Sequence, residues 1–163
     1  MKTLFIMRHA KSSWKDPRLD DHRRPLNKRG KKTAPTMGQR LKAKGVQLDV
    51  IVSSDARRAV DTAAAVAGVL GLSSGDIREM PALYHASPDR ILDIVKAFPD
   101  HWKQVMLVGH NPGLTELANR YCSPPIASIP TAGIVELRFE SPLWREIEPA
   151  CLGLSWLDFP KNN

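Results

Sequence analysis

The alternation of apolar and polar segments along the chain predicts strands and helices in turn. Short apolar runs rich in β-forming residues are typical of strands in a buried sheet. Such runs cover residues 3–7, 49–52, 77–80, 105–108 and 133–139. A further edge strand is expected around residues 144–147.

Between several of these runs the apolar positions recur at the spacing of a helix. Helices are expected over residues 27–44, 55–70 and 114–121, and Ser87-Pro88-Asp89 is the expected start of another. Because strands and helices alternate, we predict an α/β fold in three layers, a mostly parallel central sheet with helices on both faces. The length fits a single domain over residues 1–163.

The first helix carries clear signals at its ends. Asn27 is a suitable N-cap, and Gly45 is a suitable residue to end the helix. Pro35 lies inside the predicted helix and lacks the backbone N–H that helical hydrogen bonding requires. We therefore expect Pro35 to kink the helix or to split it.

The charge of the chain is concentrated at one end. The protein has a formal net charge of +7, but residues 1–45 hold 14 Lys and Arg against three Asp, and the remaining 118 residues are slightly acidic. A basic segment raises the alternative of a non-enzymatic module that binds nucleic acid or acidic proteins. The aromatic content is only 6%, and no base-stacking or helix-turn-helix motif is present, so we expect no nucleic-acid partner.

The remaining composition is that of an ordinary globular protein, with 42% hydrophobic and 25% charged residues. The longest apolar run, residues 63–72, is too short to cross a bilayer, so no membrane segment is expected. Cys122 and Cys151 form no disulfide framework or zinc-binding pattern. We expect a cytoplasmic protein with two reduced thiols.

Polar groups of related chemistry follow three of the predicted strands. In α/β sheets, ligands bind beyond the carboxyl ends of the strands, so these groups are expected to meet in one pocket. Arginine suits phosphate oxygens, and a histidine held among arginines can act as a nucleophile toward phosphorus. The groups are Arg8-His9, Ser53-Ser54 with Arg57-Arg58, and His110-Asn111.

Six sequence motifs in this order resemble those of the histidine phosphatase superfamily, which has the phosphoglycerate mutase-like fold. More narrowly, they are similar to the SixA-type branch of phosphohistidine phosphatases. The similarity extends over residues 1–139. The motifs are MRHAKSSW (7–14), RRPLNKRG (23–30), SSDARRAVDTA (53–63), LYHA (83–86), LVGHNPG (107–113) and PTAG (130–133).

The resemblance implies a role for each matching residue. His9 is the implied nucleophile, which becomes phosphorylated transiently. Arg8 and Arg58 are expected to clamp the phosphoryl oxygens, and His110 is expected to complete the pocket; Arg57 is expected to face solvent or substrate. No metal or other cofactor is implied. Further candidates for contact with substrate or phosphate are Ser12, Asn111, Lys11 and His85.

The sequence departs from the superfamily at the general acid. Many members have a Glu or Asp after the third strand, but residues 80–86 contain no carboxylate. Glu79 is more consistent with a surface position, whereas His85 fits a proton donor or a surface residue equally well. Because an imidazole that carries a proton on its other nitrogen leaves as a neutral group without an external acid, this absence favours phosphohistidine over phosphate esters.

The expected substrate is therefore a phosphohistidine in a protein. The short chain predicts an open pocket, which suits a protein side chain and favours hydrolysis of the phosphoenzyme by water. A phosphomonoesterase acting on a small phosphorylated metabolite remains the enzymatic alternative. Arg23 and Arg24 are candidates for steering an acidic partner. Trp14 fits substrate contact and anchoring of its loop equally well.

Overall fold

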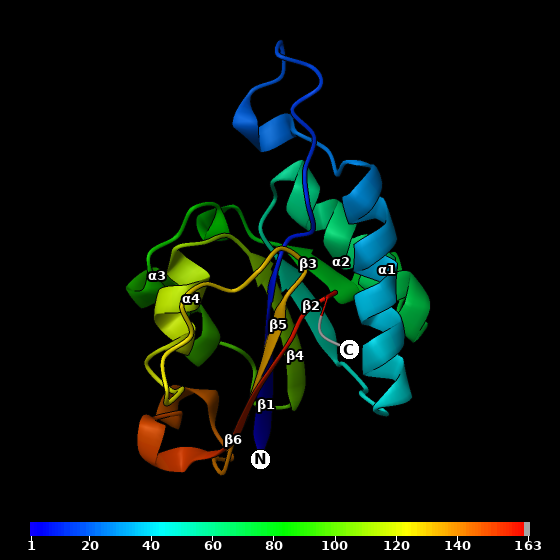
Figure 1. Ribbon diagram of the computed structural model, residues 1–163. Coiled ribbons are helices and arrows are strands. Elements are labelled where there is room, and N and C mark those ends of the chain that lie inside the picture. Colours follow the sequence, from blue (N-terminus) through cyan, green and yellow to red (C-terminus); the bar gives the residue numbers. More distant parts are fainter. Residues whose placement is uncertain (162–163) are drawn as a thin grey trace.

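A single sheet runs through the centre of the protein in the computed structural model, which describes residues 1–161 (Figure 1). Within that range its six strands follow the order β3-β2-β4-β1-β5-β6. Their bounds are β1 (Lys2–Arg8), β2 (Val50–Ser53), β3 (Ile77–Glu79), β4 (Gln104–Gly109), β5 (Ile134–Phe139) and β6 (Leu152–Asp158).

The sheet is mixed but mostly parallel, as the sequence predicts. Strand β4 lies parallel to both β1 and β2, and β2 lies parallel to β3. Strands β5 and β6 continue the sheet in the antiparallel direction. The carboxyl ends of β1, β2 and β4 therefore share one edge of the sheet.

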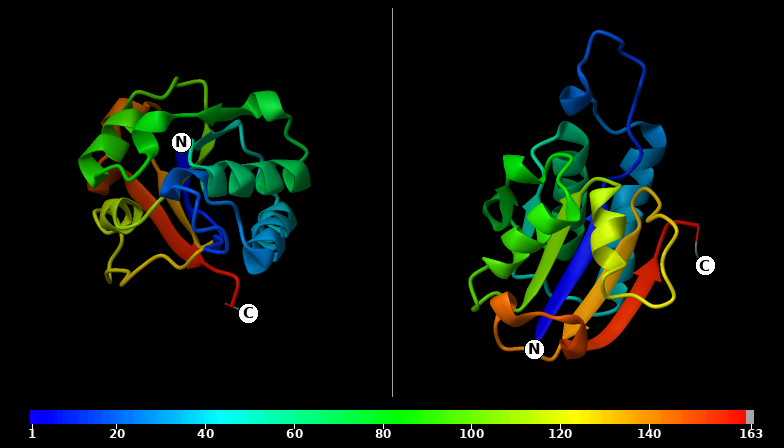
Figure 2. Two further views of the ribbon diagram at one scale, coloured as in Figure 1. Left: turned by 90° about the horizontal axis from the view of Figure 1, so that it is seen from above. Right: turned by 90° about the vertical axis from the view of Figure 1, so that its left-hand side faces the viewer.

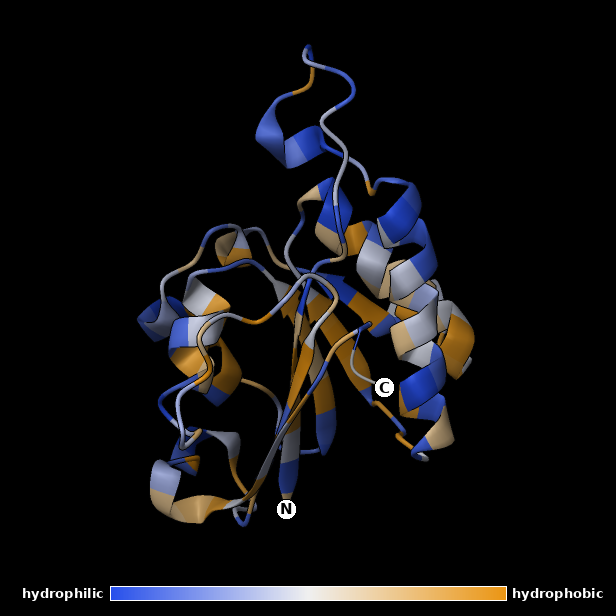
Figure 3. Ribbon diagram, in the orientation of Figure 1, coloured by the Kyte–Doolittle hydropathy of each residue, from blue (hydrophilic) through white to orange (hydrophobic). Residues whose placement is uncertain are grey.

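Helices cover both faces of the sheet, which gives the three predicted layers (Figures 1 and 2). Helices α1 and α2 pack together on one face, and α3 and α4 lie on the other. Figure 3 shows that hydrophobic residues are concentrated along the central strands. The helix bounds are α1 (Lys28–Ala43), α2 (Arg57–Leu70), α3 (Pro88–Lys96) and α4 (Gly113–Ala118), and the short 3₁₀ helices are η1 (Asp21–Arg23), η2 (Ser74–Asp76), η3 (Pro81–Leu83), η4 (Trp144–Glu146) and η5 (Pro149–Cys151).

The side chains of β1 show why its sequence is apolar throughout. Leu4 and Ile6 belong to the core beneath α3 and α4, whereas Phe5 and Met7 belong to the core beneath α1 and α2. All four are at most 1% exposed. A strand with both faces buried needs apolar residues at every position rather than at alternate ones.

The predicted helix caps are present, but the expected break at Pro35 is not. Asn27 accepts a hydrogen bond from the N–H of Gly30 at 2.8 Å. Helix α1 nevertheless continues through Pro35 as one element. Proline removes one helical hydrogen bond, and the buried face that includes Met37 and Leu41 packs against α2 and stabilises the helix despite this loss.

The expected edge strand at residues 144–147 is wrong. Trp144 begins the 3₁₀ helix η4, its side chain is fully buried, and its indole N–H donates to the carbonyl oxygen of Trp102 at 2.8 Å. The apolar residues of this segment are there because they fill the core rather than because they pair in a sheet. The edge position is taken by β6, which pairs with β5.

A polar segment, residues 9–27, rises beyond the carboxyl ends of the strands (Figures 2 and 3). It is fixed at its base, because the N–H of Asn27 donates to the carbonyl oxygen of Lys11 at 2.9 Å and that of Ser13 to Pro25 at 2.8 Å. The segment forms a wall above the sheet edge. Among residues 1–161, no helix has the length and apolar character needed to cross a membrane.

Candidate active site

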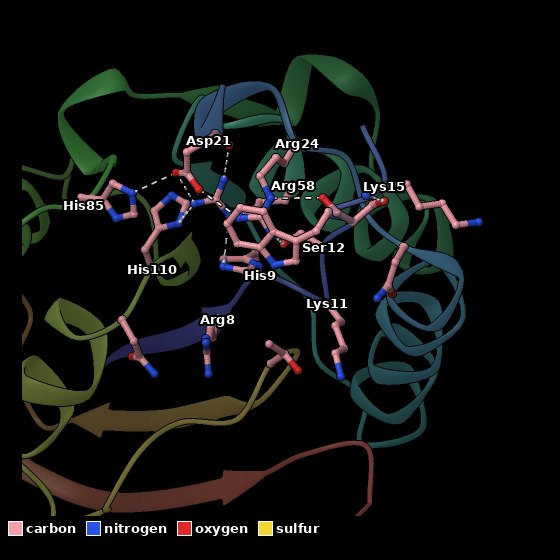
Figure 4. A pocket seen from close by; sticks show the side chains of 15 residues that line it. Arg8, His9, Lys11, Ser12, Lys15, Asp21, Arg24, Arg58, His85 and His110 are labelled. Carbon is pink, nitrogen blue, oxygen red and sulfur yellow. Dashed lines mark hydrogen bonds and ion pairs between the residues drawn. The ribbon is translucent and has the colours of Figure 1, made fainter. Parts of the chain in front are cut away.

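A cavity of about 740 Å³ lies between the polar segment and the carboxyl edge of the sheet (Figure 4). It is the place at which the three strand ends meet. All eight residues that the sequence singles out as site residues line this cavity. They are Arg8, His9, Lys11, Ser12, Arg58, His85, His110 and Asn111.

His9 follows β1 directly and is 8% exposed. Its Nδ1 lies 2.7 Å from the carbonyl oxygen of Ala10, which can only accept, so Nδ1 carries the ring proton. Its Nε2 accepts a hydrogen bond from Nε of Arg58 at 3.3 Å. The lone pair of Nε2 is therefore engaged by Arg58 in this structure, and attack on a phosphorus atom requires that contact to break.

The surroundings keep His9 neutral. Burial is the main cause that lowers the pKa of His9 to about 4. The hydrogen bond to Ala10 opposes this shift, and the nearby charges of Arg58, Arg8 and Arg24 add to it. At neutral pH the imidazole is therefore uncharged, and its Nε2 carries no proton.

His110 follows β4 and faces His9, with the two ring centres 5.2 Å apart. Its Nε2 lies 2.8 Å from the hydroxyl oxygen of Ser54, and its Nδ1 lies 3.4 Å from Nη2 of Arg58. Burial is the main cause that lowers the pKa of His110 to about 3, and the charges of His9 and Arg58 add to it. A dianionic phosphoryl group between the two rings would favour the protonated form of His110.

The two arginines at the start of α2 have opposite surroundings. The side chain of Arg58 is 3% exposed and reaches into the pocket, whereas that of Arg57 is 60% exposed and lies 3.7 Å from Asp61. This agrees with the prediction that Arg58 is the pocket residue. Arg8 also lines the pocket; its Nη1 donates to the carbonyl oxygen of Ile129 at 3.1 Å, and its Nε is buried without a hydrogen-bond partner within residues 1–161.

Asp21, which the sequence did not indicate as a site residue, contributes a carboxylate to the pocket (Figure 4). The carboxylate accepts hydrogen bonds from Arg58 and Arg24, each at 2.9 Å, from Tyr84, and from His85 at 3.1 Å. Burial alone would raise the pKa of this carboxyl, but the four donors outweigh burial and hold the pKa well below its usual range. Asp21 is therefore ionised at neutral pH. The one indication of Asp21 in the sequence is its negative charge within a strongly basic segment.

The position of Arg24 also differs from the expectation. It is 7% exposed, donates to Ser12 and Asp21, and lies under the indole ring of Trp14 with 3.2 Å between the guanidinium carbon and the ring centre. The expectation that Arg24 steers a partner from the surface is wrong, because its charge is already paired. Trp14 is 75% exposed, so it covers Arg24 rather than anchoring its loop in the core.

The remaining candidates divide between the pocket and its frame. The side chain of Asn111 donates to the carbonyl oxygen of Ile129 at 2.9 Å and accepts from Thr115, so it holds the wall of the cavity in place. Lys11 is exposed at the rim. Glu79 ends β3 in an exposed position outside the cavity lining, as the sequence suggested.

Among residues 1–161, no group of three or more His, Cys, Asp or Glu side chains is arranged to hold a metal ion.

An α/β sheet with a neutral histidine, paired arginines and a second histidine at its carboxyl edge defines a class of anion-binding proteins whose reactive group is histidine. A family model described as histidine phosphatase superfamily (branch 1) matches residues 4–116. The chain belongs to this superfamily, which implies a phosphatase with a histidine nucleophile.

Relatives in sequence do not identify a substrate. An uncharacterized protein of Mycobacterium tuberculosis is 32% identical over 165 residues, which cover 95% of this chain and 100% of that protein. An uncharacterized chloroplastic protein of Arabidopsis thaliana is 33% identical over 127 residues, which cover 72% of this chain and 58% of that protein.

Solved structures share the fold over nearly the whole chain. A protein of Nakamurella multipartitia assigned as the phosphohistidine phosphatase SixA superposes with a TM-score of 0.83 and 27% identity, covering 98% of this chain and 96% of that one. The protein histidine phosphatase SixA in complex with tungstate has a TM-score of 0.80 at 22% identity, with 98% of each chain covered.

Proposed function

We propose that this protein is a metal-independent phosphatase that removes the phosphoryl group from phosphohistidine in a protein substrate. The observation that carries the proposal is the state of His9. Its Nδ1 proton is held by Ala10, its pKa is lowered to about 4, and its Nε2 faces the pocket beside Arg58. This is the arrangement that attack on phosphorus requires.

The reaction proceeds in two steps, transfer of the phosphoryl group to His9 and its hydrolysis. The lone pair on Nε2 of His9 forms a bond to phosphorus while the N–P bond of the substrate breaks, and its electron pair returns to the substrate imidazole. Water then attacks the phosphorus of phospho-His9, releases inorganic phosphate and restores neutral His9. Arg8 and Arg58 neutralise the phosphoryl oxygens during both transfers.

The ionised state of Asp21 supports phosphohistidine as the substrate. A carboxylate is present in the pocket, although it comes from the segment before α1 rather than from the stretch after the third strand. Because its four donors keep it ionised, Asp21 has no proton to give to an alkoxide leaving group. A leaving imidazole does not need that proton. The structural neighbours with 27% identity, assigned as SixA phosphohistidine phosphatases, support the same choice.

His85 is the side chain through which a phosphate ester could still be protonated. Its Nε2 lies 3.1 Å from Asp21, and its side chain is 51% exposed. If the protein is a metabolite phosphomonoesterase instead, His85→Ala should abolish turnover of alkyl phosphates. If phosphohistidine is the substrate, this variant should retain most of its activity on phosphohistidine.

The covalent intermediate provides the direct test. A protein carrying radiolabelled phosphohistidine is mixed with enzyme, and the reaction is quenched in base, in which phosphohistidine survives and phosphate esters of serine are lost. We expect label on the wild type and on His101→Ala, an exposed histidine outside the pocket, and none on His9→Ala. Undiminished labelling of His9→Ala would overturn the mechanism.

Two further arms test the substrate and the absence of a metal requirement. Activity on phosphohistidine should persist after treatment with EDTA, and tungstate, an oxyanion that one structural neighbour binds, should inhibit competitively. A metabolite panel run at the same enzyme concentration compares the two enzymatic alternatives. Faster turnover of an alkyl phosphate than of phosphohistidine would contradict the proposed substrate.

A further inference from the structure

Five basic side chains border one side of the catalytic cavity, and the protein itself does not neutralise them. All five are exposed. Within residues 1–161 none of their side chains makes a hydrogen bond, an ion pair or a ring contact. We call this set the cationic rim, and it consists of Lys11, Lys15, Lys28, Arg29 and Lys31.

The cationic rim is continuous with the cavity. Lys11 and Lys15 line the cavity itself, and Figure 4 shows both on the side opposite His85. Lys11 and Arg29 also line a neighbouring depression of about 300 Å³. A third depression, of about 460 Å³, shares Lys15 with the cavity and extends to Lys28 and Lys31. A chain segment entering the cavity from this side therefore passes over unpaired cations.

The position of the cationic rim is fixed relative to His9. The first turn of α1 approaches the segment after His9 so closely that a Cβ atom on Gly30 would lie 2.1 Å from the carbonyl oxygen of Lys11. The backbone hydrogen bond from Asn27 to Lys11, at 2.9 Å, holds the same contact. The rim thus belongs to the ordered frame of the pocket, and its charges do not depend on a mobile loop.

Two other cations that line the cavity are neutralised within the protein. Those of Arg24 and Arg58 are both paired with Asp21. The part of the chain beyond residue 45 is slightly acidic. The unpaired lysines of the cavity lining, Lys11 and Lys15, therefore lie together on one approach to the cavity, and such a distribution favours a negatively charged partner on that approach.

We propose that the cationic rim binds an acidic segment that flanks the phosphohistidine of the substrate protein. This inference rests on the proposed function, because a phosphohistidine remains attached to its own backbone while it reaches His9. The residues beside it must then lie against the edge of the cavity. A metabolite small enough to lie within the cavity would gain little from Lys28 or Lys31, which line a separate depression.

Two phosphohistidine peptides of equal length test the proposal, one with Asp and Glu around the histidine and the other with Asn and Gln. The test variant is Lys28→Glu with Lys31→Glu, and the matched control is Lys32→Glu with Lys42→Glu. The control residues are exposed on the same helix but line none of the three depressions. Both variants change the net charge equally. Circular dichroism confirms that each is folded.

We expect kcat/KM of the wild type to be about tenfold higher for the acidic peptide at low salt, and this preference should fade as salt rises. The test variant should lose the preference, and the control should keep it. Free phosphohistidine should be hydrolysed equally by all three proteins, because it does not reach Lys28 or Lys31, which line a separate depression.

Three results would overturn this inference. They are equal rates for the two peptides at low salt, equal losses in the two double variants, or tighter binding of the rim to single-stranded RNA than to the acidic peptide. The proposed function fails in a different way, since the wild type would then hydrolyse neither peptide nor free phosphohistidine.

Discussion

The guanidinium of Arg58 holds Asp21 at two points. Its Nη2 donates to a carboxylate oxygen at 2.9 Å, and its Nη1 donates to the backbone carbonyl oxygen at 2.7 Å. The same guanidinium reaches His9 through Nε at 3.3 Å. Asp21 thus positions the arginine that orients the proposed nucleophile, and its charge competes for that arginine with an anion in the pocket.

Replacement of Asp21 by Asn separates these two effects. We expect inorganic phosphate to bind about tenfold more tightly, because a negative charge beside the anion site is removed. At the same time kcat should fall about tenfold or more, because Arg58 loses its charged anchor. Calorimetric titration with phosphate and steady-state kinetics measure the two effects. Asp16→Asn, in the same segment but paired with the exposed Arg18, is the control and should change neither value.

The neighbouring arginines offer a matched pair of variants. Arg58→Lys keeps a positive charge but loses the planar group that contacts Asp21, His9 and His110 together, so kcat/KM should fall by about 100-fold or more. Arg57→Lys changes an exposed side chain and should stay within about twofold of the wild type. Similar losses in both variants would contradict the assignment of Arg58 to the pocket.

The lowered pKa of His9 predicts the acid limb of the pH profile. The free enzyme should keep its nucleophile active well below pH 6.5, and kcat/KM should fall as the pH drops through about 4, where His9 becomes protonated. Stability should fall as the pH drops from about 6.5 to about 4, because the unfolded chain binds a proton near pH 6.5 and the folded one does so only near 4. Activity assays and circular dichroism spectra recorded at each pH separate the loss of activity from the loss of folded protein. A rate that stayed constant below pH 4 in folded protein would argue against a histidine nucleophile.

Replacement of Trp14 tests whether its exposed ring supports the pocket wall. It covers Arg24, which in turn contacts Ser12 and Asp21. Because a cation–π contact contributes about 0.5–2 kcal/mol, Trp14→Ala should raise KM for a phosphohistidine peptide by about three- to tenfold with little change in kcat. Trp14→Phe, which keeps an aromatic face, should have a KM close to that of the wild type. An unchanged KM in Trp14→Ala would show that the ring has no part in binding.

Replacement of two helical glycines by alanine should change the stability of the protein in opposite directions. A Cβ at Gly30 would lie 2.1 Å from the carbonyl oxygen of Lys11, so Gly30→Ala should destabilise the protein by about 2 kcal/mol or more. Gly68 is exposed in α2 with nothing within 4 Å of a Cβ, and Gly68→Ala should stabilise the protein by about 0.5–1 kcal/mol. Denaturant unfolding measures both. Equal stability of the two variants would contradict the close contact at Gly30.

The fold could be predicted largely from local pattern. The apolar runs that become β1, β2 and β4 are buried on both faces, so every position carries the same signal. The prediction of strands from apolar runs failed where residues are apolar because they pack in the core and not because they belong to a strand. Trp144 and Ile147 are apolar because they pack in the core without strand pairing, and β6 is an edge strand whose register is defined by its partner β5.

The part of the site that follows the strands could also be predicted. His9, Arg58 and His110 each stand directly after a strand or at the first turn of the helix that follows, so the topology alone brings them to one edge. Asp21 and Arg24 stand in a long irregular segment with no periodic pattern, and their place depends on how that segment folds back over the sheet.

The sequence by itself therefore determined the class of fold, the edge at which ligands bind and the histidine-based chemistry, because these follow from strand periodicity and from residues at strand ends. Only the tertiary structure decided which charges are neutralised. Arg24 and Arg58 are paired with Asp21, whereas Lys11 and the other residues of the cationic rim have no partner within residues 1–161. Pairing depends on distances of a few ångströms between segments remote in sequence, and no local pattern encodes them.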